Sequence, residues 1–206
     1  MVTAHVNNVL PKNFSENPLD QFNRWFDDAK NCPAILQANA MCLSTVNSDG
    51  FPDGRMVLLK GFDARGFVFF TNLNSVKGKS LAKTPRAALT FHWDPLARQV
   101  RLQGATEPVT DAEADAYWVT RPRISQIGAW ASLQSEVLDR NRTFIKRLSE
   151  YAVKFGTAKV PRPPNWTGIR LVPHKIEFWR ARRGRLHERF LYALKGAQWT
   201  AARLYP

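Results

Sequence analysis

The sequence predicts a single antiparallel β-barrel with helical additions at its edges. Many short apolar runs are separated by tight turns that contain glycine, such as those at 47–50 and 63–66. A chain of 206 residues with 44% hydrophobic residues and seven Trp is long enough for one domain with a full core. No repeat, low-complexity stretch or linker divides it. We expect residues 17–206 to form this domain and residues 1–16 to form a mobile N-terminal arm.

Strands are expected wherever short apolar or β-branched runs lie between turn residues. These runs are 41–46, 55–60, 67–71, 86–93, 99–105, 169–172, 175–179, 186–192 and 199–204. Because tight turns join the first three, we expect them to pair in order as an antiparallel meander.

Helices are expected where capping residues precede apolar residues at helical spacing. Asn17 followed by Pro18 opens the first helix, and Thr110 with Glu113 forms a capping-box pattern. The expected helices are 18–30, 76–83, from 110 to before Pro122, 125–132 and about 138–155.

The run 55–60 has four consecutive apolar residues between Arg55 and Lys60, and we expect a buried strand with a cation at each end. The two cations would lie about 16 Å apart. Buried charges are costly unless paired, so these cations either reach water or hold anions. Strict alternation puts Arg55 and Lys60 on opposite faces of the strand. Both serve one site only if the strand twists or bulges, or if a second subunit supplies the other surface.

The chain is strongly basic, with 30 Lys and Arg against 17 Asp and Glu and a net charge of +13. Such an excess attracts polyanions, so nucleic acid has to be considered. The cations are dispersed, however, and the densest cluster lies within 180–189. This dispersed distribution of cations suits the binding of small phosphorylated ligands at least as well as the binding of a nucleic-acid duplex.

Several classes of chemistry have no signature in this sequence. The four His have no metal-ligand spacing, so no metal site is expected, and no P-loop, G-x-G-x-x-G or nucleophile elbow occurs. No apolar run is long enough to span a bilayer, and Met1 to Leu10 has no signal-peptide pattern. Cys32 and Cys42 have neither disulfide nor metal spacing, which favours a cytoplasmic location. Any catalysis is therefore expected to use a bound cofactor.

Seven short motifs occur together in a fixed order. They are RMVLLK at 55–60, FFTN at 69–72, RQV at 98–100, RPR with SQIGA within 121–129, QS at 134–135, EFW at 177–179 and RLHER at 185–189. In this order and spacing the chain resembles the pyridoxine/pyridoxamine phosphate oxidase family over about residues 17–206. Each motif alone is weak, but seven in order are specific.

The resemblance implies a homodimeric, antiparallel split β-barrel that binds FMN at the subunit interface. Arg55 and Lys77 would hold the FMN phosphate, and the backbone of 56–59 would run beside the cofactor. The residues that match the family's FMN contacts are Arg55, Met56, Val57, Leu58, Leu59, Lys60, Phe70, Thr71, Lys77, Gln99, Gln134, Ser135, Trp179 and Arg189.

The resemblance also implies the reaction, in which pyridoxine or pyridoxamine phosphate is oxidised to pyridoxal phosphate and oxygen is reduced to hydrogen peroxide. Lys60, Tyr117, Arg121 and Ser125 match the residues that grip the substrate phosphate and ring. Arg185 and His187 match the pair that closes over the substrate near the flavin. His187 acts there either as a base or by positioning the substrate.

Two departures from the family pattern bear on the ligands. Val76 replaces an Arg beside the phosphate-binding Lys77, which removes one cofactor contact. Val2 to His5 replace a segment that folds over the vitamin substrate, a difference shared with the phenazine-biosynthesis oxidases that act on dihydrophenazine precursors. These oxidases are the alternative interpretation. A non-catalytic flavin- or nucleic-acid-binding split barrel is a third, suggested only by the charge of +13.

Overall fold

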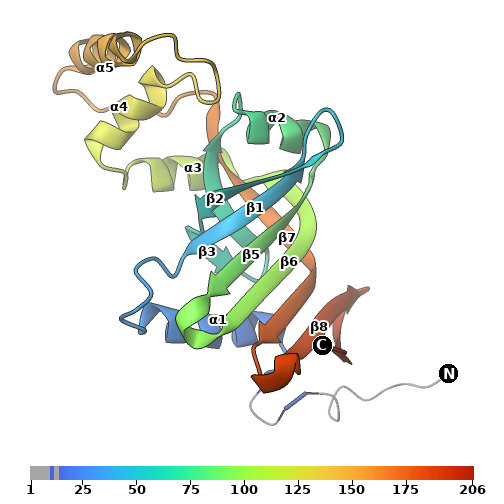
Figure 1. Cartoon of the computed structure of the whole chain (residues 1–206). Helices are drawn as coiled ribbons and strands as arrows, with labels where there is room; N and C mark the ends of the chain where they lie inside the picture. Colours follow the sequence, from blue (N-terminus) through green and yellow to red (C-terminus); the bar gives the residue numbers. More distant parts are fainter. Residues whose placement is uncertain (1–9, 12–13) are drawn as a thin grey trace.

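The computed structural model describes residues 10–11 and 14–206 of the chain. Within these residues, nine strands form one antiparallel sheet that curls into a half-open barrel (Figure 1). The order is β2-β1-β5-β6-β7-β4-β3, and β8 pairs with β7 and with β9. The predicted antiparallel barrel with helices at its edges is confirmed.

The strands have the following bounds: β1 (Ala40–Val46), β2 (Pro52–Leu58), β3 (Gly61–Asp63), β4 (Gly66–Asn72), β5 (Arg86–Trp93), β6 (Arg98–Pro108), β7 (Trp166–Arg180), β8 (Glu188–Lys195) and β9 (Gln198–Leu204). The helices are α1 (Pro18–Lys30), α2 (Val76–Lys83), α3 (Asp111–Trp118), α4 (Arg123–Ala131) and α5 (Asn141–Phe155). Two short 3-10 turns cover Asp94–Leu96 and Arg183–Arg185.

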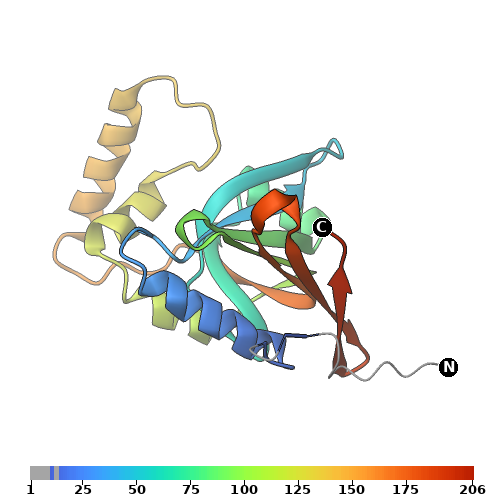
Figure 2. The ribbon, with the colours of Figure 1, turned by 60° about the horizontal axis from the view of Figure 1, so that its bottom comes forward.

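The helix α1 covers one end of the curled sheet (Figures 1 and 2). It begins and ends at the residues that the sequence predicts. The Asn17 side chain accepts a hydrogen bond from the N–H of Leu19 at 2.9 Å, so it caps the first turn. The apolar face of the helix enters the core, where the Phe22 ring contacts Phe67 and Phe91 at centroid distances of 4.9 and 5.1 Å. The pattern of one polar and one apolar face therefore fixes how this helix docks.

The N-terminal arm predicted over 1–16 falls largely outside the described residues, and so does the stretch Val2 to His5. The described residue Phe14 is 9% exposed and belongs to the barrel core. Its ring lies 4.6 Å from that of Phe190 in β8. Phe14 therefore packs on the domain although it precedes residue 17, the start of the domain expected from the sequence.

The helices α3, α4 and α5 stand together at one side of the sheet (Figure 1). They enclose a second, smaller core around Trp118, Ile127, Val160 and Trp166. Because Trp166 is the first residue of β7, this helical lobe is attached to the barrel through that strand.

The strand expected over 55–60 differs from the prediction. β2 ends at Leu58, so Lys60 lies outside the strand. No residue of β2 is buried, and Met56 is 65% exposed. The expectation of a buried strand is wrong because β2 is the edge strand of the sheet and pairs only with β1. A run of four apolar residues cannot by itself distinguish a central strand from an edge strand that borders a cavity.

The expected three-strand meander is also wrong. β1 and β2 form an antiparallel hairpin, but β4 pairs with β3 and β7 at the other end of the strand order. The short strand β3, which was not predicted, turns the chain away from β2. Sequence proximity therefore did not decide the pairing partner of β4.

The two strands expected at 169–172 and 175–179 form the single strand β7. Gln103 of β6 lies opposite Lys175, and Gly104 lies opposite Pro173, so His174 is the extra residue of a bulge. The irregular register lets the strand continue past Pro173, which has no N–H to donate to the ladder.

The Glu113 carboxylate in the first turn of α3 leads to a prediction about the stability of the folded protein at low pH. Thr110 donates its backbone N–H to Glu113 at 3.0 Å, and Arg170 donates to the same carboxylate at 2.6 Å. These hydrogen bonds, that from the Thr110 backbone foremost, lower the pKa of Glu113 from 4.5 to about 2. The folded protein thus binds a proton at Glu113 less readily than the unfolded chain does.

We expect this carboxylate to contribute stability above about pH 4.5 and to lose that contribution as the pH falls toward about 2. Glu113→Gln should reduce the slope of unfolding free energy against pH in this window, measured by urea denaturation followed by circular dichroism. Parallel curves for the wild type and the variant would contradict the expectation.

Candidate active site

A cavity of about 820 Å³ lies between the sheet and the helical lobe. Its volume is in the range of roughly 300–1,000 Å³ that small-molecule sites occupy. Eleven of the residues predicted for cofactor or substrate line it: Met56, Val57, Leu58, Lys60, Phe70, Thr71, Lys77, Tyr117, Arg121, Ser125 and Gln134. Residues distant in the sequence are therefore brought together around one cavity.

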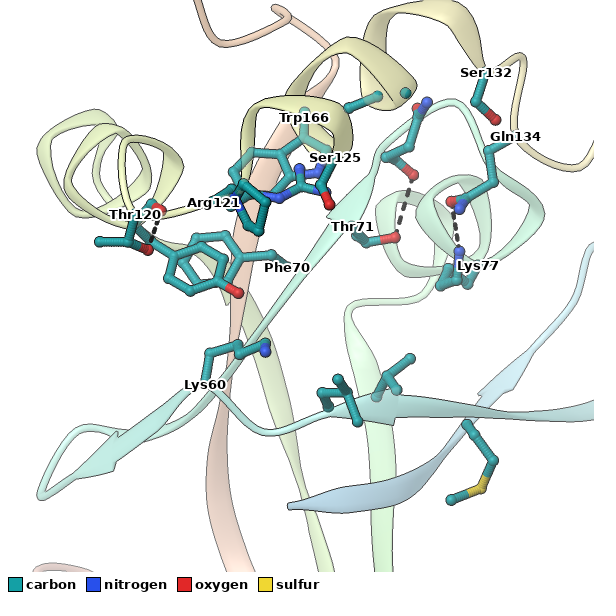
Figure 3. A pocket seen from close by; sticks show the side chains of 18 residues that line it. Lys60, Phe70, Thr71, Lys77, Thr120, Arg121, Ser125, Ser132, Gln134 and Trp166 are labelled. Carbon is teal, nitrogen blue, oxygen red and sulfur yellow. Dashed lines mark hydrogen bonds between the residues drawn. The ribbon is translucent and has the colours of Figure 1, made fainter. Parts of the chain in front are cut away.

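Much of the cavity wall comes from the ends of elements, while α4 contributes Ser125, Gly128 and Ala129 along its length. β2 contributes its last residues, and β4 contributes Phe70 and Thr71 where it leaves the sheet. The first turn of α2 supplies Lys77, and the connection between α3 and α4 supplies Arg121. Lys60 follows β2 directly. Figure 3 shows Lys60 and Arg121 toward one end of the cavity and Lys77 with Gln134 toward the other.

Lys77 is the cation at the second end. Its Nζ donates to Gln134 Oε1 at 2.8 Å and to Ser75 Oγ at 3.0 Å, which links α2 to the loop after α4. Burial lowers the pKa of Lys77, and the positive charge of Arg55 lowers it further. An anion bound beside Lys77 would therefore relieve both desolvation and repulsion.

Arg55 is near enough to repel Lys77, but it is not among the residues that line the cavity. The guanidinium donates to Thr45 Oγ1 at 2.7 Å, to the carbonyl of Leu43 at 3.2 Å and to the carboxylate of Asp53. Sequence reasoning did not include these partners.

At the first end, the guanidinium of Arg121 lies over two indole rings. Its central carbon is 4.7 Å from the centre of the Trp166 ring and 5.1 Å from that of Trp118. Burial lowers the pKa of Arg121, and its Nη1 is buried without a hydrogen-bond partner among the described residues. Such a donor is costly to leave unpaired, so it suits an anionic ligand.

Lys60 completes this end of the cavity together with an aromatic stack. Its Nζ lies 5.7 Å from the centre of the Tyr117 ring. That ring stacks on Phe70 at 4.0 Å, and Phe70 stacks on Trp166 at 5.1 Å. The cations Lys60 and Arg121 therefore lie against a rigid aromatic wall, which favours binding of a group that is both flat and negatively charged.

Sequence reasoning missed several residues of this site, among them Trp166, which lines the cavity, and Trp118, whose ring lies against Arg121. Each lies next to an expected element, but nothing local in the sequence shows that either ring faces Arg121. Only the packing of α3 against the start of β7 brings them together.

Five predicted residues lie at the other end of the sheet and do not line the cavity: Gln99, Trp179, Arg185, His187 and Arg189. Gln99, Trp179 and Arg189 are opposite one another on β6, β7 and β8. The His187 ring lies 4.7 Å from that of Trp179. Trp166 and Trp179 are near opposite ends of β7, about 43 Å apart along an extended strand.

Two further predicted residues border the cavity without lining it. Leu59 is 4% exposed and packs in the barrel core, so only its backbone is near the site. Ser135 follows Gln134 in a left-handed conformation with φ of 73° and lines a separate cavity of about 340 Å³. Among the residues that the structure describes, no group of three His, Cys, Asp or Glu is arranged to hold a metal.

Along the described part of the chain, no helix has both the length and the apolar character that crossing a membrane requires.

Comparison with protein families shows which family the chain belongs to. Residues 29–180, which make up most of the chain, match the family model described as pyridoxamine 5'-phosphate oxidase. The chain belongs to the pyridoxamine 5'-phosphate oxidase family. Residues 166–206 match a second model, the C-terminal dimerisation region of pyridoxine 5'-phosphate oxidase, which here comprises β7, β8 and β9. This match supports a homodimer.

Named relatives are similar over almost the whole chain. The pyridoxine/pyridoxamine 5'-phosphate oxidase of Caulobacter vibrioides is 55% identical over 192 residues, 93% of this chain and 86% of that protein. The enzyme of the same name from Sphingopyxis alaskensis is 48% identical over 204 residues, 99% of this chain and 94% of that protein. The chain is thus an enzyme of an oxidase family.

Two solved structures share the fold. PhzG from Burkholderia lata, in complex with tetrahydrophenazine-1-carboxylic acid, has a TM-score of 0.88 at 30% identity and covers 97% of this chain and 98% of its own. A pyridoxamine 5'-phosphate oxidase-related, FMN-binding protein from Nostoc punctiforme has a TM-score of 0.74 at 17% identity and covers 94% of this chain and 100% of its own.

The unpaired Nη1 of Arg121 leads to a prediction about stability. Arg121→Met should stabilise the ligand-free protein by about 1 kcal/mol, because it removes a buried donor that has no partner and keeps the packing against the two indoles. Thermal unfolding without flavin or phosphate measures this, and Arg24→Met on the exposed side of α1 is the control. A lower melting temperature for Arg121→Met than for the control would contradict the expectation.

Proposed function

We propose that the protein is an FMN-dependent oxidase that converts pyridoxine or pyridoxamine 5'-phosphate to pyridoxal phosphate, with oxygen as acceptor and hydrogen peroxide as product. The observation that supports this most is that one cavity has separate cationic groups at its two ends. Lys77 lies at one end and Arg121 with Lys60 at the other. A nucleotide cofactor and a phosphorylated substrate bring one phosphate each to these two ends.

The residues present fit the flavin nucleotide. Arg55, Lys77, Gln134 and Ser135 would hold its phosphate, and Thr71 with the backbone of 56–59 would lie along the rest of the molecule. The repulsion between Arg55 and Lys77 supports a dianion there, since a dianion stabilises both charges. When bound, FMN would accept a hydride from the substrate carbon that bears the amine or hydroxyl and pass the electrons to oxygen. The oxidised amine would then react with water and release ammonia to give the aldehyde.

The substrate phosphate is assigned to Lys60 and Arg121. A guanidinium fixed on two indoles presents its donors in one orientation, and the Lys60 ammonium adds a point charge from the segment that follows β2. Tyr117 and Ser125 flank this position. The protein's part in the reaction is to bind the ester, exclude water around the reacting carbon and hold it in one orientation.

The remaining predicted residues are assigned to the site of the partner subunit in a homodimer. Gln99, Trp179 and Arg189 would contact the partner's flavin, while Arg185 and His187 would orient the reacting carbon of its substrate. Two observations support this: these residues lie at the far end of β7 from the cavity, and 166–206 matches a dimerisation region. On this arrangement one subunit contains two half-sites and no complete one.

A phenazine-pathway oxidase is the second candidate, because PhzG at 30% identity is similar over nearly the whole chain. The combination of Lys60, Tyr117, Arg121 and Ser125 around one end of the cavity favours the vitamin ester. A phenazine carboxylic acid has no phosphate to occupy that end. The proposed location is cytoplasmic, which the two unpaired cysteines support.

The purified protein should be yellow and should release peroxide with pyridoxine or pyridoxamine phosphate. Its visible spectrum and a peroxide assay with each ester test this, and reduced phenazine precursors are the comparison substrates. Turnover of the precursors and of neither ester would replace the first candidate by the second. A colourless protein that binds DNA in a salt-dependent way would overturn both.

Two arginine variants should separate substrate and cofactor roles. Arg185→Ala should retain FMN but lower turnover on the order of 10-fold or more, because it removes a group that orients the reacting carbon. Arg55→Ala should lower FMN retention, measured by the flavin-to-protein absorbance ratio after gel filtration. Arg183→Ala, in the same exposed 3-10 turn as Arg185, is the matched control. Identical behaviour of Arg185→Ala and Arg55→Ala would contradict this division.

Complementation between variants should test the shared sites. Arg121→Met damages the cavity half and Arg185→Ala damages the far half, so each variant alone has two defective sites per dimer. Co-expression in equal amounts should restore about a quarter of wild-type activity, because half of the dimers are hybrids with one intact site. Purification through two different affinity tags isolates the hybrid. An inactive hybrid would mean that both halves come from the same subunit.

A further inference from the structure

Arg170 is a buried cation that the proposed reaction does not use. It lies within β7, and its side chain is 4% exposed. Its guanidinium contacts three carboxylates: Glu113 at 2.6 Å, Asp63 at 3.3 Å and Glu107 at 3.8 Å. Removing a guanidinium from water is costly, so a buried Arg with three carboxylates around it has a defined geometry that is expensive to disturb.

Two of these carboxylates lie in segments that also carry residues of the substrate-phosphate end of the cavity. Asp63 ends β3, three residues after Lys60. Glu113 is in the first turn of α3, one helical turn before Tyr117, and α3 leads on to Arg121. Arg170 is therefore a direct ionic connection between the segment that carries Lys60 and the helix that carries Tyr117.

The packing around Arg170 leaves little freedom for this connection to move. A Cβ at Gly66, which begins β4, would lie 2.2 Å from the carbonyl oxygen of Leu171 and 3.2 Å from Cγ of Arg170. The β3–β4 turn thus lies directly on β7. Glu107 pairs with Arg170 across the β6–β7 ladder, and its carboxylate lies 3.8 Å from Nε of Arg170.

We propose that Arg170 is a positioning residue that sets the distance between Lys60 and the Tyr117–Arg121 wall, and so the affinity of the site for the substrate phosphate. This proposal rests on the proposed function. A phosphate has to contact both walls at once, and a displacement of about 1 Å is enough to weaken such a site substantially. Arg170 touches neither ligand and acts through Asp63 and Glu113.

Arg65 provides a natural comparison because it pairs with the same two carboxylates. It lies 2.6 Å from Asp63 and 3.0 Å from Glu113, but its side chain is 63% exposed. Exposed ion pairs contribute little, since water replaces either partner. Water cannot replace the partners of the buried Arg170 in this way. A Lys in place of Arg170 would have a single charged nitrogen, which does not reach both carboxylates.

The test compares Arg170→Met, Arg170→Lys and the matched control Arg65→Met as FMN-loaded enzymes. Inorganic phosphate is the probe, used as a competitive inhibitor of ester oxidation. In Arg170→Met the inhibition constant for phosphate and the KM for the ester should both rise on the order of 10-fold, while kcat and FMN content stay within about twofold. Arg170→Lys should recover part of the loss, and Arg65→Met should match the wild type.

A merely structural role predicts a different pattern, in which kcat, FMN content and melting temperature fall together with phosphate affinity. That pattern, or an unchanged inhibition constant in an active Arg170→Met enzyme, overturns this inference and leaves the proposed function standing. If Arg170→Met does not fold, Asp63→Asn removes the ion pairs of Asp63 with Arg170 and with Arg65. It should raise the same inhibition constant, whereas Arg65→Met, which removes only the Arg65 pairs, should not. A wild type that oxidises neither ester and is not inhibited by phosphate overturns the proposed function together with the inference.

Discussion

The site depends on keeping positive charge partly dehydrated without a counter-ion among the residues that the structure describes. Arg121 lies on two indole rings with one buried nitrogen unpaired, and Lys77 is partly buried close to a second cation. Both arrangements are unfavourable in the ligand-free chain. They persist because the surrounding packing is extensive: the aromatic stack, the first turn of α2 and the attachment of α3 to β7 would all have to change before either cation reached bulk water.

The capped helices were predictable from the sequence because their signals are local. Asn17 with Pro18, Ser75, and Thr110 with Glu113 fix the starts of α1, α2 and α3 within a few residues of chain. Most of the cavity residues were also predictable, since they lie in motifs that occur in a fixed order. The motifs did not show that Gln99 and Trp179 lie at the opposite end of the sheet from Lys77.

The errors came from contacts between segments far apart in the sequence. β4 was expected beside β2, but it pairs with β7, almost a hundred residues further along the chain. Burial of β2 was overestimated because an edge strand and a central strand can have the same run of apolar residues. Trp166 was missed because its importance depends on Arg121, which reaches it only once the helical lobe has folded.

If the two ends of β7 serve different active centres of a homodimer, as proposed above, this placement has a genetic consequence. In a cell that makes a normal and a damaged chain, a lesion confined to one half leaves every mixed pair with one working centre. A lesion that disrupts both ends of the strand disables both centres of the mixed pair, so the damaged allele acts dominantly. The inheritance of a defect in this protein would therefore depend on where along one strand the lesion falls.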